Sequence, residues 1–466
     1  MQRAAKRDEA RCDGRCSALR QTTLDFRPKT GSCRLGGRSV LSQHGENAAK
    51  KAYCCWREER TNSRRTSEFI PESQQKRRES TLYSLIILPA RTAIPPKKPT
   101  FALVNKTALG KERASRHNMT ASREQTTWLP AEWNSQWGVQ LTWPHEDTDW
   151  LPILNEVTEC YLNMSQAIAS RENLLVVTPH PARVRALLES RLSSEEMGRV
   201  SLCEMPTNDT WARDHGFITL LEADGKRRLL DFQFNGWGMK FAAEKDNRIC
   251  RTLMQQGAIE GTYEDHLDFV LEGGSIESDG HGTILTTQQC LMAPHRNQPL
   301  TREQIEERLK ASLHAHRVLW LTHGTLAGDD TDGHVDTLAR LCPHDTIAYV
   351  QCTDTADEHY EELHLMEEEL KAMRTQEGNP YRLLPLPMAE PAFDDEGNRL
   401  PATYANFLFV NGAILLPTYG TPATDQEAVS RMQQAFPEYE IIGIDCRPLI
   451  IQHGSLHCCT MQFPNT

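Results

Sequence analysis

The stretch Asp330-Thr331-Asp332-Gly333-His334-Val335-Asp336 places an imidazole and a carboxylate two residues apart. The apolar run before it, Val318–Leu321, predicts a buried strand, and the polar region 324–333 predicts a loop. If the stretch is extended, alternation directs His334 and Asp336 to the same face. One such pair alone is more typical of a solvated strand end, so its meaning depends on what the rest of the chain supplies.

Charge divides the 466-residue chain into two unlike parts. Residues 1–118 hold 26 Lys and Arg against 11 Asp and Glu, a net charge of +15. The rest holds 26 basic and 52 acidic side chains, a net charge of −26. Parts that differ so much are not expected to form one folded unit. An acidic domain disfavours nucleic acid as a partner and favours cationic ligands.

The first part has the composition of a disordered segment, because it is rich in Arg, Ser, Thr and Gln and lacks helical or strand periodicity. No Met occurs between Met1 and Met119, and the composition typical of folded proteins begins right after Met119. We therefore expect residues 1–118 to be a disordered or spurious extension from an over-extended reading frame. Residues 119–466 are expected to be the functional domain.

Neither a membrane segment nor a secretory signal is predicted. No apolar run approaches the length that spans a membrane, and the apolar stretch Thr81–Ala90 is short and lies too far into the chain to be a signal. Of 14 Cys, five precede residue 119 and nine follow it, without paired spacings. Reduced cysteines in a cytoplasmic protein without a membrane partner are therefore expected.

The part after Met119 alternates helical and strand patterns. Apolar residues recur at helical spacing over Thr148–Asn173, and the run Leu174–Val177 predicts a buried strand. Further helices are predicted over Pro181–Arg199 and from near Lys245, Thr301, Asp357 and Ala423, each followed by an apolar strand such as Val200–Cys203. Tyr404–Tyr419 predicts a hairpin that turns at Asn411-Gly412. The pattern predicts an α/β fold of repeated modules, in an open sheet or a closed ring.

Two further motifs carry carboxylates. Asn208–Gly216 combines two Asp with Trp211, an Arg and a His, and if it is extended, Arg213 and Asp214 face opposite ways. A polar turn is an equally good interpretation of this segment. Glu272 follows the buried run Phe269–Leu271, where an unpartnered carboxylate is rare, and the two glycines after it allow a close backbone approach.

The C-terminal motif Gln452–Gln462 contains two adjacent thiols. A buried structural Cys is the plainest interpretation. A second interpretation is zinc ligation through His453, His457, Cys458 and Cys459, but their spacing does not match the usual paired ligands. A thiolate nucleophile assisted by His334 is the third. If the segment is extended, Cys458 and Cys459 point to opposite faces, so one thiol serves chemistry and the other the core.

In this order the motifs resemble the guanidine-modifying superfamily, and most closely its agmatine and peptidylarginine deiminase branch. The four motifs are Trp211–Asp214, Glu272–Ser275, Gly333–Asp336 and His453–Cys458. Supporting matches are Leu129–Trp133, Thr142–Pro144 and Asp231–Trp237. The resemblance covers about residues 119–466. His453 departs from the family pattern, which usually has a further Gly there, and this concerns loop geometry rather than the nucleophile.

The resemblance implies a five-bladed, pseudo-symmetric α/β propeller (a pentein), which agrees with the recurring helices. It also implies hydrolysis of a guanidinium group to a ureido group with loss of ammonia, without metal or cofactor. Cys458 would attack the guanidinium carbon, His334 would transfer protons, and Glu272 would add a third acceptor. The substrate would be bound by Asp214, Asp336 and Trp211.

The leading hypothesis is therefore a cytoplasmic agmatine deiminase that acts on a small guanidine and yields N-carbamoylputrescine for putrescine and polyamine synthesis. The alternative within the same chemistry is deimination of peptidyl-arginine or free arginine to citrulline. A silent scaffold is disfavoured because Asp214, Glu272, His334 and Cys458 are all present, and a metal-binding module would be revealed by a chelator. The sequence leaves open whether the protein forms a homo-oligomer.

Overall fold

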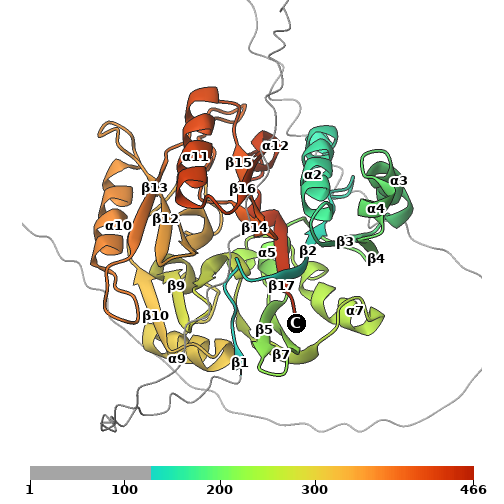
Figure 1. Ribbon diagram of the computed structural model, residues 1–466, viewed down its shortest axis with the longest axis horizontal. Helices are drawn as coiled ribbons and strands as arrows, with labels where there is room; N and C mark the ends of the chain where they lie inside the picture. The colour runs from blue at the N-terminus through green and yellow to red at the C-terminus, as the bar shows by residue number, and fades with distance from the viewer. Residues whose placement is uncertain (1–126) are drawn as a thin grey trace, which may run out of the picture. The chain divides into compact units, whose positions relative to one another are not determined.

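The computed structural model describes residues 127–466, so the expectations for residues 1–118 lie outside the described residues. In the described part, Figure 1 shows helices around the outside and strands toward the middle. The strands form five small sheets. This confirms the predicted α/β class.

Each of the five sheets repeats one topology, in which an antiparallel pair of strands is followed by a parallel pair. The first has the order β1 (Thr127–Trp128), β5 (Ile218–Glu222), β6 (Arg227–Gln233), β7 (Thr262–Val270). The second is β8 (Ile276–Ser278), β9 (Thr283–Thr287), β10 (Arg317–Leu321), and the third is β11 (Ala339–Cys342), β12 (Thr346–Gln351), β13 (Arg382–Pro387). The fourth is β14 (Leu408–Val410), β15 (Ala413–Thr418), β16 (Glu440–Asp445). The fifth joins the two ends of the domain: β17 (Thr460–Pro464), β2 (Gln136–Thr142), β3 (Asn173–Thr178), β4 (Val200–Glu204).

One helix connects the parallel strands of each module, as parallel pairing requires. These helices are α2 (Leu154–Ala169), α7 (Ile249–Gln256), α9 (Arg302–Leu313), α10 (Tyr360–Ala372) and α11 (Pro422–Ala435). The sequence predicted all five helices, with wider bounds for α2. The helix predicted over Pro181–Arg199 is divided into α3 (Pro181–Glu189) and α4 (Ser194–Met197), because Ser193 and Glu196 form a capping box that starts a new helix. Thr301 caps α9 in the same way.

The hairpin predicted within Tyr404–Tyr419 is confirmed. Strands β14 and β15 pair across Asn411-Gly412, and Gly412 has the positive φ of 74° that such a turn favours in glycine. Strands β8 and β9 likewise pair across Asp279-Gly280. Short helices α6 (Gly236–Met239) and α8 (Gln288–Leu291) precede α7 and α9 in the same connections, and α12 (Arg447–Ile450) lies between β16 and β17.

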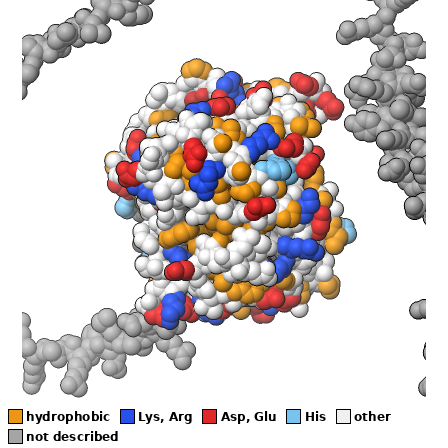
Figure 2. All heavy atoms as spheres, turned by 90° about the vertical axis from the view of Figure 1, so that its right-hand side faces the viewer, with side chains coloured by type: hydrophobic (Ala, Val, Ile, Leu, Met, Phe, Trp, Pro, Cys, Tyr) orange, Lys and Arg blue, Asp and Glu red, His pale blue; other side chains and the backbone are white. Residues whose placement is uncertain are grey.

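The apolar core lies between each sheet and its helix. In the third module Leu363, Met366 and Leu370 form one stripe of α10 and pack with Ile347 and Val350 of β12. Burying each such side chain contributes roughly 1.5–3 kcal/mol. Figure 2 shows acidic, basic and apolar side chains interspersed on the face near α3 and α7. Among residues 127–466, no helix combines the length and the apolar character needed to cross a membrane.

Short helical turns carry the four predicted motifs. They are α5 (Ala212–His215), η4 (Gly273–Ser275), η5 (Val335–Thr337) and η6 (His457–Cys459). The extended conformation considered for these motifs is therefore wrong. The turns contact one another, α5 touching both η4 and η6 and η4 touching η5, so residues far apart in sequence meet at one place.

Candidate active site

The structure brings the predicted catalytic and binding side chains together in a buried cluster. Glu272, His334 and Asp336 have no exposed surface, and Asp214 and Cys458 are 3% and 4% exposed. They come from four short turns or the residue that precedes one, and His334 and Asp336 share η5. Because buried ionisable groups are costly unless partnered, such a cluster marks a functional site.

A cavity of about 180 Å³ leads from solvent to Asp214 and Cys458. Trp211 is one of its walls, as expected for a substrate-binding residue, and Trp237 is another. The other lining residues are Asp149, Asp209, Phe241, Asp330, Thr331, Gln452, His453 and Gly454. The cavity is therefore aromatic and strongly acidic, which suits a cationic ligand.

Two glycines allow this close packing. A Cβ on Gly274 would lie 2.6 Å from His334 Nδ1 and 2.9 Å from Asp214 Oδ1, so only glycine leaves room for both groups. A Cβ on Gly454 would lie 2.2 Å from the Trp211 ring. The close backbone approach predicted for the Gly-Gly pair after Glu272 is thus confirmed at Gly274.

Asp214 is held by donors on both oxygens. Its Oδ2 accepts a hydrogen bond from Trp237 Nε1 at 3.0 Å, and its Oδ1 accepts one from Gly274 N at 3.2 Å. Burial raises the pKa of Asp214 to about 6, with further increases from the charges of Asp336 and Glu272 and an opposing effect of His334. A cation placed beside this carboxyl would favour its ionised form.

His334 is poised to hold a proton. Its Nδ1 lies 3.6 Å from Asp214 Oδ1, and neither ring nitrogen has a hydrogen bond of good geometry within the described residues. Burial opposes its charge, but Asp214, the Cys290 thiol and Asp336 together raise the pKa of His334 well above its ordinary value. An imidazolium in this position can act as a general acid.

The Cys458 thiol faces a carboxylate and an amide. Its Sγ lies 3.9 Å from Asp336 Oδ2 and 3.4 Å from Asn406 Oδ1. Burial and the negative charges of Asp336 and Asp214 raise the pKa of Cys458 well above its usual value. The thiol is therefore protonated in the free site, and a cation between the sulfur and the carboxylates would reverse this effect.

Asp336 stays ionised despite its burial. Its Oδ2 accepts a hydrogen bond from His457 Nδ1 at 2.7 Å. Burial would raise the pKa of Asp336, but this hydrogen bond and the charges of His457, His334 and Arg340 lower it below the ordinary value. The second oxygen, Oδ1, has no partner.

Glu272 is partnered on one side only. Its Oε1 accepts a hydrogen bond from Arg296 Nε at 2.9 Å, and Arg296 also donates to Asp332 Oδ2 at 2.6 Å and to Thr331 O at 2.9 Å. Its Oε2 is buried without a partner. Glu272 is thus held in place by a cation and still offers one acceptor.

Several buried atoms of the catalytic and binding candidates have no hydrogen-bond partner in the described part of the chain. They are Glu272 Oε2, Asp336 Oδ1 and both ring nitrogens of His334. Leaving a buried polar atom without a hydrogen bond costs roughly 1–3 kcal/mol. A planar guanidinium offers five donors in a fixed geometry, so it would satisfy the two carboxylate oxygens.

Metal ligation fits the geometry poorly. In residues 127–466, donor atoms lie close enough for a metal in the sets Glu272, Cys290, His334 and Glu132, Glu277, His457. A guanidinium already pairs with the carboxylates of each set: Arg296 with Glu272, and Arg340 with Glu132 and Glu277. The zinc set considered at the C-terminus does not converge, because His457 faces Glu132, Cys459 faces Tyr161 and His453 contacts Gly328 O.

Sequence reasoning missed several residues of this site. Asn406 accepts hydrogen bonds from the backbone N of His457 at 2.9 Å and of Cys458 at 3.3 Å, so it shapes the turn that carries the thiol. Cys290 adjoins His334, and Arg296 holds Glu272. Their partners are distant in sequence. Trp237, which donates to Asp214, lay within a quoted motif but had no predicted role.

The fold and the site together are those of a guanidine-modifying enzyme with α/β architecture. Residues 128–464 match the model of the Porphyromonas-type peptidyl-arginine deiminases, and the chain belongs to this family. The resemblance inferred from the four motifs is thus confirmed.

Named relatives and solved structures agree with this family. "Putative agmatine deiminase" of Vibrio parahaemolyticus is 34% identical over 370 residues, which are 74% of this chain and 99% of that protein. The structure of a "putative arginine deiminase" from Porphyromonas gingivalis is 55% identical, with a TM-score of 0.68, and covers 72% of this chain and 98% of its own. The structure of C. jejuni agmatine deiminase with substrate bound is 37% identical, with a TM-score of 0.66, and covers 72% of this chain and 96% of its own.

Proposed function

We propose that this protein hydrolyses the guanidinium group of agmatine to N-carbamoylputrescine and ammonia. The observation that carries the proposal is the set of unpartnered, buried acceptors on Asp336 and Glu272 beside the Cys458 thiol. These acceptors match the donors of a guanidinium, and the thiol is the available nucleophile. The agmatine deiminases among the relatives support the same reaction.

In this mechanism Asp214 and Asp336 hold the guanidinium between the walls formed by Trp211 and Trp237. The charge of the substrate lowers the pKa of Cys458, the thiol releases its proton to solvent, and the thiolate bonds to the guanidinium carbon. His334 donates its proton to the departing ammonia, which leaves a thiouronium on the sulfur. His334 then takes a proton from the attacking water, and the thiolate leaves as the ureido product forms. Because Arg296 fixes Glu272, that carboxylate acts as the third acceptor.

The charge of the cavity favours agmatine over free arginine. Agmatine carries an ammonium at its far end, and the outer part of the cavity presents Asp149, Asp209 and Asp330. None of the described residues that line the cavity is Lys or Arg, whereas Arg213 lines a different cavity. An α-carboxylate would therefore find carboxylates rather than a cation.

Deimination of arginine residues or free arginine to citrulline is the second candidate. The family description and the name of the P. gingivalis relative favour it. A peptide lacks the α-carboxylate next to its arginine side chain, so the acidic cavity alone does not reject it.

Ammonia release from agmatine, an arginine peptide and free arginine at equal concentrations tests the substrate. We expect kcat/KM to be much higher for agmatine than for the peptide, and lowest for free arginine. Cys458→Ser should abolish release from all three. Equal efficiency for the peptide and agmatine would reject the small-molecule assignment, and no release from any of them would reject the deiminase mechanism.

We also propose that the five modules are the blades of a pseudo-symmetric pentein propeller and that residues 119–466 are its catalytic domain. The shared strand topology and the pairing of β17 with β2 support the ring. Nine free cysteines in the described residues support a cytoplasmic location. No nucleic-acid partner is proposed, and a homo-oligomer is compatible with the site.

A protein that begins at Met119 tests the domain assignment. It should keep the turnover and the melting temperature of the full chain, because the matched family spans residues 128–464. A large loss of either would show that residues 1–118 contribute to the fold or the site.

A further inference from the structure

His457 lies between two buried carboxylates. Its Nδ1 is 2.7 Å from Asp336 Oδ2, and its Nε2 is 2.6 Å from Glu132 Oε2, with the ring only 1% exposed. Glu132 is held as a carboxylate without His457, because Phe409 N and Arg340 Nη2 donate to it at 2.9 and 3.0 Å and Arg213 Nη2 lies 3.6 Å away. An ionised carboxylate only accepts hydrogen bonds, so both ring nitrogens must donate. Only the imidazolium has two N–H groups.

A neutral ring does not fit these contacts. Arg340 Nη2 lies 3.0 Å from His457 Nε2 and could donate to it. The nitrogen lone pair and Glu132 Oε2 would then face each other at 2.6 Å with no proton between them. Arg340 has other acceptors, since its Nε donates to Glu277 Oε1 at 2.5 Å and its Nη2 lies 3.0 Å from Glu132 Oε2.

The charges of the surrounding network require a third cation. Its carboxylates are Glu132, Glu277 and Asp336, and its guanidinium groups are Arg213 and Arg340. None of the five is more than 8% exposed. Uncompensated buried charge is strongly unfavourable. A charged His457 balances three negative groups with three positive ones.

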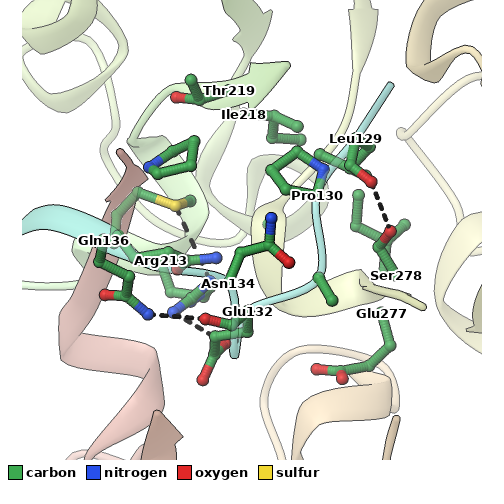
Figure 3. A pocket seen from close by; sticks show the side chains of 16 residues that line it. Leu129, Pro130, Glu132, Asn134, Gln136, Arg213, Ile218, Thr219, Glu277 and Ser278 are labelled. Carbon is green, nitrogen blue, oxygen red and sulfur yellow. Dashed lines mark hydrogen bonds and ion pairs between the residues drawn. The ribbon is translucent and has the colours of Figure 1, made fainter. Parts of the chain in front are cut away.

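Solvent reaches only one side of this network. Figure 3 shows Glu132, Arg213 and Glu277 at the wall of a second cavity, of about 60 Å³, which has room for about two waters. Arg213 Nη2 and Gln136 Oε1 are buried there without a hydrogen-bond partner among the described residues. Asp336, on the other side of His457, is not among the residues that line this cavity. On this side His457 is the cation that donates a hydrogen bond to Asp336.

We propose that His457 is a positioning residue that remains an imidazolium between Glu132 and Asp336. It occupies Oδ2 of Asp336, keeps this carboxylate ionised and leaves Oδ1 for the guanidinium. The kinetic consequence of this proposal rests on the proposed function, whereas the charge of the His457 ring does not. The charged or titratable groups that face Asp336 and His457 are Glu132, Arg213, Asp214, Glu277, His334, Arg340 and Cys458.

The variant His457→Gln tests the kinetic consequence, because its amide can donate to Glu132 but carries no charge. Without the cation, burial raises the pKa of Asp336, and the acid limb of the kcat/KM profile should become steeper and move to higher pH. On this limb the slope of log kcat/KM against pH should rise from one toward two, because Asp214 and Asp336 then both titrate there. An acid limb at the wild-type position, even with a lower melting temperature, would overturn the proposal.

His359→Gln is the matched control. His359 is 4% exposed and also hydrogen-bonds a carboxylate, Asp357 Oδ1 at 2.7 Å, but its other nitrogen accepts from Ala327 N. Its loss should lower the melting temperature and leave the acid limb unchanged. A shift of the acid limb in this control equal to that in His457→Gln would remove the specific role.

Nitrogen NMR of the full chain with 15N-labelled histidine decides the charge directly and needs no substrate. Both ring nitrogens of His457 should carry protons at pH 8, and Glu132→Gln should change this signal and so assign it. A neutral tautomer in the wild-type protein would refute the proposal. If no guanidine is turned over, the proposed function fails, while this measurement still establishes whether His457 is the third cation.

Discussion

Cys458 Sγ lies 3.9 Å from Asp336 Oδ2, so the proposed nucleophile faces a buried carboxylate. Such a neighbour disfavours the thiolate, and the pKa of Cys458 is accordingly well above its usual value. The same carboxylate attracts a cation. The site therefore couples the reactivity of the thiol to the charge of whatever enters it.

This coupling predicts selective alkylation. A cationic α-haloamidine should inactivate the protein at least about tenfold faster than the neutral α-haloamide of the same size, because roughly 1.4 kcal/mol of attraction suffices for that factor. Mass spectrometry should place the adduct on Cys458, and Cys458→Ser should remove it. Equal rates for the two reagents would contradict a thiol controlled by the neighbouring carboxylates.

The adjacent thiol, Cys459, is predicted to serve the core. It has no exposed surface and faces the buried Tyr161, and burial raises its pKa well above the ordinary value. Cys459→Ser should lower the free energy of unfolding by roughly 1–3 kcal/mol through a poorly satisfied hydroxyl and keep most of the turnover. Denaturant unfolding and ammonia release measure both. A substrate-derived adduct trapped on Cys459 would reverse the assignment.

Trp237→Phe tests the hydrogen bond to Asp214. The substitution keeps an aromatic wall but removes the Nε1 donor at 3.0 Å from Asp214 Oδ2. The pKa of Asp214 should rise above its value of about 6, so less of it is ionised at a given pH and the acid limb of kcat/KM moves to higher pH. A bond to a charged group contributes roughly 1.5–3 kcal/mol, so kcat/KM should fall about tenfold or more near pH 6.

Trp320→Phe is the control for that experiment. It removes a similar bond, from Trp320 Nε1 to Glu306 Oε2 at 2.8 Å, away from the cavity. Its pH profile should match that of the wild-type protein. The assignment of Trp237 would fail if both variants lost activity equally at every pH.

The sequence predicted the strand and helix order well because burial patterns are local. It predicted the divergence of Arg213 and Asp214 for the wrong reason. Their segment is a helical turn, in which successive side chains are about 100° apart, rather than a strand. The two side chains still point in different directions, Asp214 toward Trp237 and Arg213 toward Glu132. Adjacent residues of a helical turn also project in different directions.

The missed residues share a physical cause. Asn406 meets Cys458 across 52 positions, and Arg296 meets Glu272 across 24. Arg296 stands outside the quoted motifs, and Asn406 lies in the predicted hairpin Tyr404–Tyr419, whose pattern indicates no role in a site, so only the folded packing brings them to it. The pairing of His457 with Glu132 spans 325 positions and was equally invisible.

Substrate choice is predicted to depend on Asp209 in the wall of the cavity. Its Oδ1 accepts hydrogen bonds from Trp150 Nε1 at 2.9 Å and Thr210 N at 2.8 Å, which fix the carboxylate in place. Asp209→Asn should raise the KM for agmatine roughly fivefold, since a partly exposed ion pair contributes about 1 kcal/mol. The KM for butylguanidine, which has the same four-carbon chain but no ammonium, should hardly change. Asp395→Asn, on the surface, is the control.

The preference for agmatine should also depend on pH in a direction set by the pKa of Asp209. Burial raises the pKa of Asp209 to about 6, so the carboxylate loses its charge as the pH falls through that value. The preference for agmatine over butylguanidine should therefore shrink below pH 6 in the wild-type protein and be small at every pH in Asp209→Asn. Dividing the two kcat/KM values removes effects of Asp214, which both substrates share. An equal loss for both substrates in Asp209→Asn would mean that Asp209 shapes the cavity without contacting the ammonium.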